Sequence, residues 1–220
     1  MVEADLTKRR VMIVDDHPLI CRGLAQIINE EPDLCVCGTS DDAAAAMRLI
    51  AETKPDAVIV DLSLKHSSGL ELIKAVNVRY PKVKTIVYSM HDESIYAERA
   101  LHAGARGYIM KEHPPDIIID AIRKVLDGKY FFSDSILANM IERLSQAHAS
   151  PAGPGLDVLT NRELEIFTLI GSELSCAQIA KKLNISAKTV EAHRENIRKK
   201  LGFSNVKELQ RYAVQSLYKA

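Results

Sequence analysis

Short apolar runs alternate with helical patterns through residues 1–130. Each run is brief and bounded by charge, Gly or Pro, which is typical of a buried strand. The predicted strands are Val11–Val14, Leu34–Cys37, Ala57–Val60, Thr85–Tyr88 and Gly107–Met110. The predicted helices between them are Leu19–Asn29, Asp42–Glu52, Gly69–Arg79, Ile95–Ala103 and Asp116–Leu126. This alternation predicts an α/β fold with a doubly wound, five-stranded parallel sheet covered by helices on both faces.

The pattern changes beyond residue 130. A further helix is predicted over Asp134–His148, and Ser150–Gly155 then places two Pro and two Gly in six residues, which ends any helix. Four short helices and no strand are predicted after it, near residues 161–171, 176–183, 187–201 and 206–217. We therefore expect an α/β domain over residues 1–130, a helix and linker over 131–155, and a small all-α domain over 156–220.

The net charge of zero conceals an asymmetry between the two parts. Residues 1–150 hold 18 Lys and Arg against 22 Asp and Glu, whereas residues 151–220 hold 11 against 7. A basic C-terminal part is suited to a polyanionic partner. No apolar stretch is long enough to span a bilayer and no apolar leader follows the N-terminus, so we expect a cytoplasmic protein without membrane contact.

Acidic residues follow two of the predicted strands. Asp15 and Asp16 come directly after the first strand, and Asp61 comes directly after the third. Because the carboxyl ends of parallel strands share one edge of the sheet, these acids are expected to converge. Clustered carboxylates repel one another, and a hard divalent cation such as Mg²⁺ removes that cost. Ser89 and Lys111 follow the fourth and fifth strands, and would add a hydroxyl and a positive charge at the same edge.

At these residues the sequence resembles the receiver domain of bacterial response regulators. The resemblance covers about Arg9 to Gly128. The matching segments are Val14-Asp15-Asp16, Val60-Asp61-Leu62, Tyr88-Ser89-Met90 and Tyr108-Ile109-Met110-Lys111. The Mg²⁺ ligands that the resemblance implies are Asp15, Asp16, Asp61 and the backbone carbonyl of Ser63.

The same resemblance implies a role for each remaining residue of the edge. Asp61 would be the phosphoacceptor, and Lys111 would hold the phosphoryl group as a point charge. Ser89 would hydrogen-bond that group, and Tyr108 would turn inward as Ser89 moves. Apart from this acceptance and loss of a phosphoryl group, we expect no enzymatic activity.

Capping residues precede three of the predicted C-terminal helices. Thr160 stands three residues before Glu163, and Ser175 stands three residues before Gln178, which are two capping-box spacings. Ser186 is placed to cap the third helix, directly after a short turn. Helix, tight turn and helix in this order indicate a helix-turn-helix.

The third of these helices has two different faces. Its buried face is predicted to carry Val190, Ile197 and Leu201. The residues expected to meet DNA bases and phosphates in the major groove are Lys188, Thr189, Glu191, Ala192, Glu195, Asn196, Arg198 and Lys199. Phosphate contacts alone are expected of Lys182, Arg194 and Lys200.

This part of the chain resembles the LuxR-type helix-turn-helix. The matching segments are Leu159-Thr160-x-Arg162-Glu163, Ile179-Ala180-x-x-Leu183 and the run from Ser186 to Leu201. A receiver followed by this module is similar to the NarL/FixJ family of response regulators. Glu191 stands where some members carry lysine, which leaves the recognised base sequence open, although a carboxylate can accept a hydrogen bond from cytosine.

The combined resemblance implies a two-component regulator of transcription. A sensor histidine kinase would phosphorylate Asp61, and phosphorylation would control sequence-specific binding to promoter sites on double-stranded DNA. The last helix, Val206–Leu217, would form a homodimer on DNA, and RNA polymerase is a further candidate partner. In some members of the family the unphosphorylated receiver masks the recognition helix, and the sequence leaves open whether it does so here. Our hypothesis is that phosphorylation weakens such docking and favours dimers.

Three other functions have to be distinguished from this one. A Mg²⁺-dependent aspartyl phosphatase of the haloacid-dehalogenase kind needs a second Asp two residues after the nucleophile, where Ser63 stands. A flavin-binding sensor domain needs a Gly/Thr-rich loop after the first strand, where Asp15-Asp16-His17-Pro18 stands. A constitutive regulator with an inert receiver is disfavoured by the complete set of acids. Turnover of phosphate esters, or a yellow purified protein, would support the first or the second of these.

Overall fold

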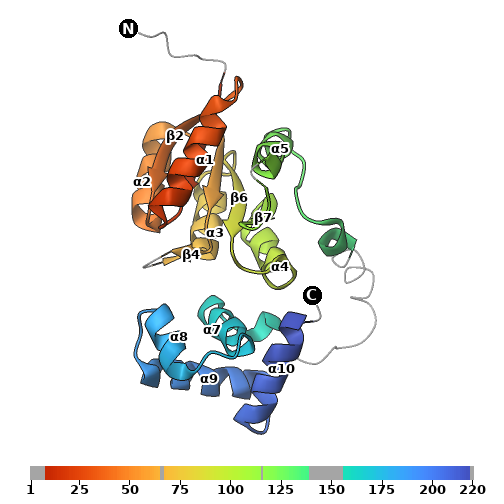
Figure 1. Cartoon of the computed structure of the whole chain (residues 1–220). Coiled ribbons are helices and arrows are strands. Elements are labelled where there is room, and N and C mark those ends of the chain that lie inside the picture. Colours follow the sequence, from red (N-terminus) through yellow and green to blue (C-terminus); the bar gives the residue numbers. More distant parts are fainter. Residues whose placement is uncertain (1–7, 65–66, 115, 139–155, 219–220) are drawn as a thin grey trace. The chain divides into compact units, whose positions relative to one another are not determined.

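The computed structural model describes residues 8–64, 67–114, 116–138 and 156–218 (Figure 1). The chain divides into two units, Met1–Ser145 and Gln146–Ala220. Of the helix predicted over Asp134–His148, residues 134–138 are helical. The rest of that helix and the predicted linker Ser150–Gly155 lie outside the described residues.

A five-stranded parallel sheet in the order β2-β1-β3-β6-β7 forms the centre of the first unit (Figure 1). Its strands are β1 (Arg9–Val14), β2 (Leu34–Ser40), β3 (Ala57–Val60), β6 (Lys84–Ser89) and β7 (Gly107–Met110). Every predicted strand is confirmed, and β1, β2 and β6 extend beyond their predicted ends. The sequence did not reveal the antiparallel pair of β4 (Ser63–Leu64) and β5 (Ser67–Ser68), because two-residue strands are too short for a period.

Helices cover both faces of this sheet (Figure 1). They are α1 (Pro18–Glu30), α2 (Ala43–Thr53), α3 (Gly69–Arg79), α4 (Glu93–Ala103) and α5 (Asp116–Leu126). A buried cluster joins α1 and α5 to alternate strand residues, with Leu24 and Ile118 packed near Ile59 and Ile86. Successive strand residues point to opposite faces, so the remaining apolar strand residues face α2, α3 and α4. The predicted doubly wound α/β fold is confirmed.

The register of β1 and β3 places the acidic residues side by side. Val14 pairs with Val60, so Asp15 and Asp61 directly follow paired positions on adjacent strands. The Asp61 amide donates to the Val14 carbonyl at 2.9 Å, which continues the ladder to the acid itself. The strand order reverses direction between β1 and β3, and ligands of such sheets bind at the carboxyl ends beside this reversal.

In the second unit, all regular secondary structure of the described residues 156–218 is helical. A short 3₁₀ turn, η1 (Leu156–Val158), precedes α7 (Asn161–Gly171), α8 (Cys176–Lys182), α9 (Ala187–Lys200) and α10 (Val206–Tyr218). All four predicted helices are confirmed. Both predicted capping boxes are present, and Ser186 Oγ accepts from the Thr189 amide at 3.0 Å. None of the helices described in either unit has the length and apolar character that crossing a membrane requires.

Glu163 joins the first and third helices of this unit. Its side chain is 5% exposed, and Oε2 accepts from Lys200 Nζ at 2.6 Å and from the Thr160 amide at 2.7 Å. Burial raises the pKa of the Glu163 carboxyl, but the bonds from Lys200 and Thr160 lower it by more. The pKa of Glu163 therefore lies below its ordinary value of 4.5.

Replacing Glu163 by glutamine is expected to lower the free energy of unfolding at about pH 7 by about 1–3 kcal/mol, because a cap is weakened and a charge partner is lost. A carboxyl whose pKa is lowered by folding stabilises the protein above its unfolded pKa and stops doing so as pH falls through its folded pKa. The difference between wild type and variant should therefore shrink below pH 4.5. Urea unfolding at neutral and at acidic pH measures the free energy of unfolding of both proteins. A difference between wild type and variant that is equal at the two pH values would contradict the role given to the Glu163 carboxylate.

Candidate functional site

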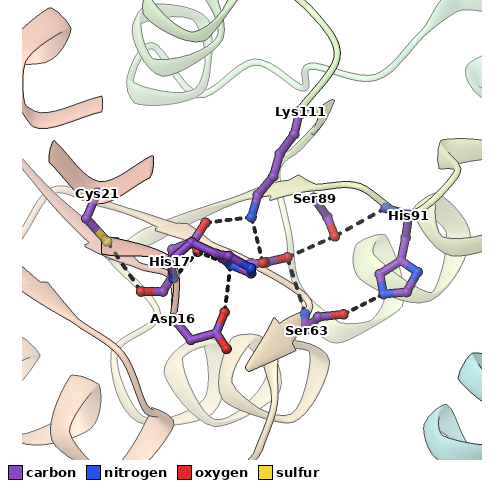
Figure 2. Close-up of polar contacts among 9 residues, drawn as sticks. Asp16, His17, Cys21, Ser63, Ser89, His91 and Lys111 are labelled. Carbon is purple, nitrogen blue, oxygen red and sulfur yellow. Dashed lines mark hydrogen bonds and ion pairs between the residues drawn. The ribbon is translucent and has the colours of Figure 1, made fainter. Parts of the chain in front are cut away.

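Lys111 lies between two carboxylates at the carboxyl edge of the sheet (Figure 2). Its Nζ is 2.6 Å from Asp15 Oδ2 and 2.6 Å from Asp61 Oδ2. All three side chains are at most 5% exposed. Burial lowers the pKa of Lys111, but the two carboxylates raise it by more, so its pKa lies above the ordinary value and the ammonium is retained. The predicted convergence of Asp15, Asp61 and Lys111 is thus present.

The second oxygen of Asp61 is held by β6 and by the segment that follows β3. Ser89 is fully buried, and its Oγ donates to Asp61 Oδ1 at 2.9 Å. The Ser63 amide donates to the same oxygen at 3.2 Å. Because Lys111 Nζ donates to Asp61 Oδ2, both carboxylate oxygens are held and the group has a fixed orientation. Asp61 directly follows β3 and is 3% exposed. A carboxylate held in this way is already oriented and does not need to reorganise.

Asp16 completes the acidic cluster. The carboxylates of Asp15, Asp16 and Asp61, together with a ring nitrogen of His17, offer ligand atoms that all lie within 4.8 Å of one another. Asp15 Oδ2 and Asp16 Oδ1 are buried and have no hydrogen-bond donor in a favourable geometry, although Lys111 Nζ lies 2.6 Å from the first and His17 Nδ1 lies 2.8 Å from the second. Buried oxygens that lack hydrogen bonds, in a set dominated by carboxylates, fit a hard divalent cation.

Tyr108 is connected to Asp61 through His91 and Ser89. Its ring is 2% exposed, and its hydroxyl donates to the His91 carbonyl at 2.9 Å. The His91 amide donates in turn to Ser89 Oγ at 3.4 Å. Burial raises the pKa of the Tyr108 phenol well above 10.0, so it remains a donor. In this structure Tyr108 therefore lies inward while Ser89 contacts Asp61. The role of Tyr108 as a switch stays a prediction.

His91 was not singled out by the sequence reasoning. Its Nε2 lies 2.7 Å from Ser63 Oγ, so the imidazole joins the loop after β6 to the segment after β3 (Figure 2). The ring also lies against Tyr96, with centroids 4.5 Å apart. Its position two residues after Ser89 at a strand end was the available signal, because loops at this edge carry the site.

Gly69 is a second residue that the sequence reasoning missed. Its amide donates to the Leu62 carbonyl at 3.1 Å as α3 begins. A side chain here would collide with the backbone carbonyl of Asp61, and its Cβ would lie 2.7 Å from Leu62 Cα. The absence of a side chain at Gly69 therefore lets α3 start against the backbone of Asp61.

A Gly69→Ala variant is expected to lose about 1–3 kcal/mol of stability, because the clash is with backbone and cannot be relieved by a rotamer change. Uptake of phosphate at Asp61 should slow in the same variant, since the acceptor backbone has to shift. Gly23→Ala is the matched control, because nothing lies within 4 Å of a Cβ there and the position is inside α1. If both variants melt at the wild-type temperature, the proposed close approach is wrong.

The candidate nucleic-acid surface lies on α9. Val190 and Ile197 are fully buried and Leu201 is 8% exposed, which confirms the predicted inner face. The exposed residues among the predicted DNA contacts are Lys188, Thr189, Glu191, Ala192, Asn196 and Lys199. The helix therefore presents a long, mostly polar face next to the α8–α9 turn.

Some predicted contacts are engaged within the unit instead. Arg198 donates to both carboxylate oxygens of Glu195, at 2.9 and 2.7 Å, and to the Phe203 carbonyl at 2.6 Å. The Arg198 guanidinium lowers the pKa of Glu195 to about 2. Lys200, expected on a phosphate, is paired with Glu163. Arg198 and Lys200 therefore hold the end of α9 in place in the free protein, and their contacts with DNA stay a prediction.

Two family models match the chain, one in each unit. Residues 11–123 match the response regulator receiver domain, and residues 157–213 match the bacterial regulatory proteins of the luxR family. The matched ranges contain the acidic cluster and α9 respectively.

Known proteins resemble the chain over most of its length. It is 34% identical over 211 residues to the oxygen regulatory protein NreC of Staphylococcus aureus, covering 94% of this chain and 97% of that protein. It matches the response regulator RcsB in a complex with DNA, with 25% identity, a TM-score of 0.56, and coverage of 93% and 97% of the two chains.

The first unit also matches an isolated receiver domain. This is the receiver of RcsB from Salmonella enterica serovar Typhimurium, solved with the phosphomimetic BeF₃⁻. The identity is 25%, the TM-score 0.54, and the match covers 60% of this chain and 97% of that one. With both family models matched, and with a relative matched over 94% of this chain, the chain belongs to the NarL/FixJ family of two-component response regulators.

Proposed function

We propose that Asp61 accepts a phosphoryl group from a sensor histidine kinase and that the phosphorylated protein binds promoter DNA through α9. The observation that carries this proposal is the geometry around the acceptor: Lys111 Nζ lies 2.6 Å from Asp61, and Ser89 Oγ lies 2.9 Å from it. Phosphoryl transfer depends mainly on positioning and charge neutralisation, and this arrangement supplies both.

In the transfer step an Asp61 oxygen forms a bond to phosphorus while the phosphorus–nitrogen bond of the kinase phosphohistidine breaks. The electron pair of that bond leaves with the imidazole, which then takes up a proton. Lys111 holds the oxygens of the transferred group as a point charge, and Ser89 donates to them. Beyond this acceptance and later loss of phosphate to water, we propose no enzymatic activity.

A magnesium ion fits the acidic cluster beside the acceptor. Asp15, Asp16, Asp61 and the backbone carbonyl of Ser63 would hold it, which agrees with the buried oxygens of Asp15 and Asp16 that lack hydrogen bonds. The ion would offset the negative charge of the incoming group. Lys111 carries one positive charge and pairs with the carboxylates of both Asp15 and Asp61. It cannot also neutralise the negative charge of a phosphoryl group.

The loop after β6 is the element that would respond to phosphorylation. The phosphoryl oxygens on Asp61 would compete with Asp61 Oδ1 for the hydrogen bond that the Ser89 hydroxyl donates. The same hydroxyl accepts a hydrogen bond from the His91 amide. His91 in turn is held by Tyr108, whose hydroxyl lies 2.9 Å from its carbonyl. A shift of Ser89 is thereby passed to Tyr108 and to the start of α4, which is how a local charge change reaches a surface.

DNA binding is assigned to the exposed face of α9. A recognition helix that follows a tight turn enters the major groove, where Lys188, Asn196 and Lys199 would meet bases and phosphates. The complex of the related RcsB with DNA supports this use of the module. We also propose that α10 forms the homodimer on DNA, that RNA polymerase is a partner at the promoter, and that the protein acts in the cytoplasm, where its DNA and kinase meet.

Incubation of the full chain with acetyl phosphate tests the proposal without the kinase. A phosphate-affinity gel should show one retarded species that forms with Mg²⁺ and is absent when a chelator replaces it. The species should disappear with time as water attacks the acyl phosphate. Phosphate uptake that is equal with and without Mg²⁺ would contradict the role given to the acidic cluster.

A further inference from the structure

His17 adds a nitrogen atom to a cluster of carboxylate oxygens. Its Nδ1 lies 2.8 Å from Asp16 Oδ1 and 3.1 Å from Asp15 Oδ1, and Figure 2 shows the ring beside Asp16. The Mg²⁺ ligands proposed above do not include this residue, and the proposed phosphorylation does not use its ring.

The backbone fixes where the imidazole can lie. The His17 amide donates to Asp15 Oδ1 at 2.8 Å, and His17 is the N-cap of α1 with Pro18 as the first helical residue. Its side chain makes no capping bond, so the ring is turned to the acids rather than to the helix amides. The side chain is 63% exposed, which leaves it free to adjust by small rotations.

The spacing matches that of ligands around one cation. When bonds to a metal are about 2.1 Å long, neighbouring octahedral ligands lie about 3 Å apart and opposite ones about 4.2 Å apart. The two His17 separations, 2.8 and 3.1 Å, are those of neighbouring ligands. The whole group, within 4.8 Å, needs only a slight contraction to enclose an ion.

We propose that His17 is a nitrogen ligand of the cation in this site, and that the site thereby favours borderline first-row ions such as Co²⁺ over Mg²⁺ more than its carboxylates alone would. This inference rests on the proposed function, because it takes the acidic cluster to be the cation site. Imidazole suits transition metals, whereas Mg²⁺ prefers oxygen ligands and retained water. A hydrogen bond from His17 to the acids, without ligation, is the competing explanation for the same distances.

The test is direct cation binding by the full, unphosphorylated chain in phosphate-free buffer. His17→Asn is the main variant, because asparagine is a good N-cap and the position is exposed, so the fold is retained. We expect this variant to bind Co²⁺ about tenfold more weakly and Mg²⁺ nearly as well as wild type. Its cobalt absorption bands should move to longer wavelength as the stronger-field nitrogen is lost.

Pulsed paramagnetic resonance of bound Mn²⁺ gives an independent readout. Wild type should show coupling to a ligating imidazole nitrogen, and His17→Asn should lose it. His102→Asn is the matched control, since it removes an exposed histidine at the end of α4 and should change neither signal. An unchanged cobalt affinity and a retained nitrogen coupling in His17→Asn would overturn the inference.

A third variant separates this failure from failure of the proposed function. Asp15→Asn should lose most of the affinity for both Co²⁺ and Mg²⁺, because it removes a buried cluster ligand. If Asp15→Asn loses cation binding while His17→Asn keeps it, only the role of His17 is wrong. If Asp15→Asn binds both ions like wild type, the cluster is not the cation site and the proposed function fails with it.

Discussion

An Asp61→Asn protein is expected to take up no phosphoryl group from acetyl phosphate, whereas wild type is labelled within the same incubation. Asparagine fills the same space and can still accept from Ser89, but its amide has no anionic oxygen to attack phosphorus. A phosphate-affinity gel measures the labelled fraction. Any gain in DNA affinity caused by acetyl phosphate should vanish in the same variant.

Asp120→Asn is the matched control for this experiment. It makes the same chemical change on the exposed side of α5, where Asp120 pairs with Lys124 at 2.9 Å. Labelling should equal that of wild type. Retained labelling in Asp61→Asn would place the acceptor on another residue and remove the basis of the switch.

Reversing the charge of Lys188 is expected to weaken binding to the preferred DNA sequence by at least about tenfold, since loss of one direct contact typically costs about 1–3 kcal/mol and the new carboxylate also repels phosphate. Lys188 is exposed at the start of α9, on the face opposite Val190. Fluorescence anisotropy with a duplex selected from a random pool measures the affinity of Lys188→Glu. Labelling of Asp61 should be unaffected.

Lys82→Glu controls for the change in net charge. It lies on an exposed turn of the first unit, far along the chain from α9, and carries the same charge reversal. Its DNA affinity should equal that of wild type at moderate salt, where exposed charges at a distance are screened. If both variants lose the same affinity, binding depends on overall charge and α9 is not the recognition element.

Sequence patterns predicted most of the helices and strands because the spacing of apolar residues and the placement of charged and capping residues indicate the same boundaries. The strands are apolar runs ended by charge, and Asp15 and Asp61 mark where two of them stop. In a parallel sheet that information is sufficient to bring the acids together, since the register of adjacent strands leaves little freedom. The caps at Thr160, Ser175 and Ser186 located the C-terminal helices for a similar local reason.

Features that depend on tertiary approach were not accessible in this way. His91 reaches Ser63 across the site, and nothing in the local sequence specifies that contact. Gly69 is required by the backbone of Asp61, eight positions earlier in the chain. Arg198 donates to the Phe203 carbonyl beyond the end of α9, a contact that its position on the helix does not reveal. Such contacts follow from packing between elements rather than from periodicity.

The most direct test of the central claim is the DNA affinity of one wild-type sample before and after phosphorylation with acetyl phosphate and Mg²⁺. We expect the dissociation constant for DNA to be at least about fivefold lower after phosphorylation, because coupling between two sites typically changes affinity by about this factor or more. It should return to the starting value as the phosphoryl group is lost. An unchanged dissociation constant, while a phosphate-affinity gel shows most of the protein phosphorylated, would contradict the central claim.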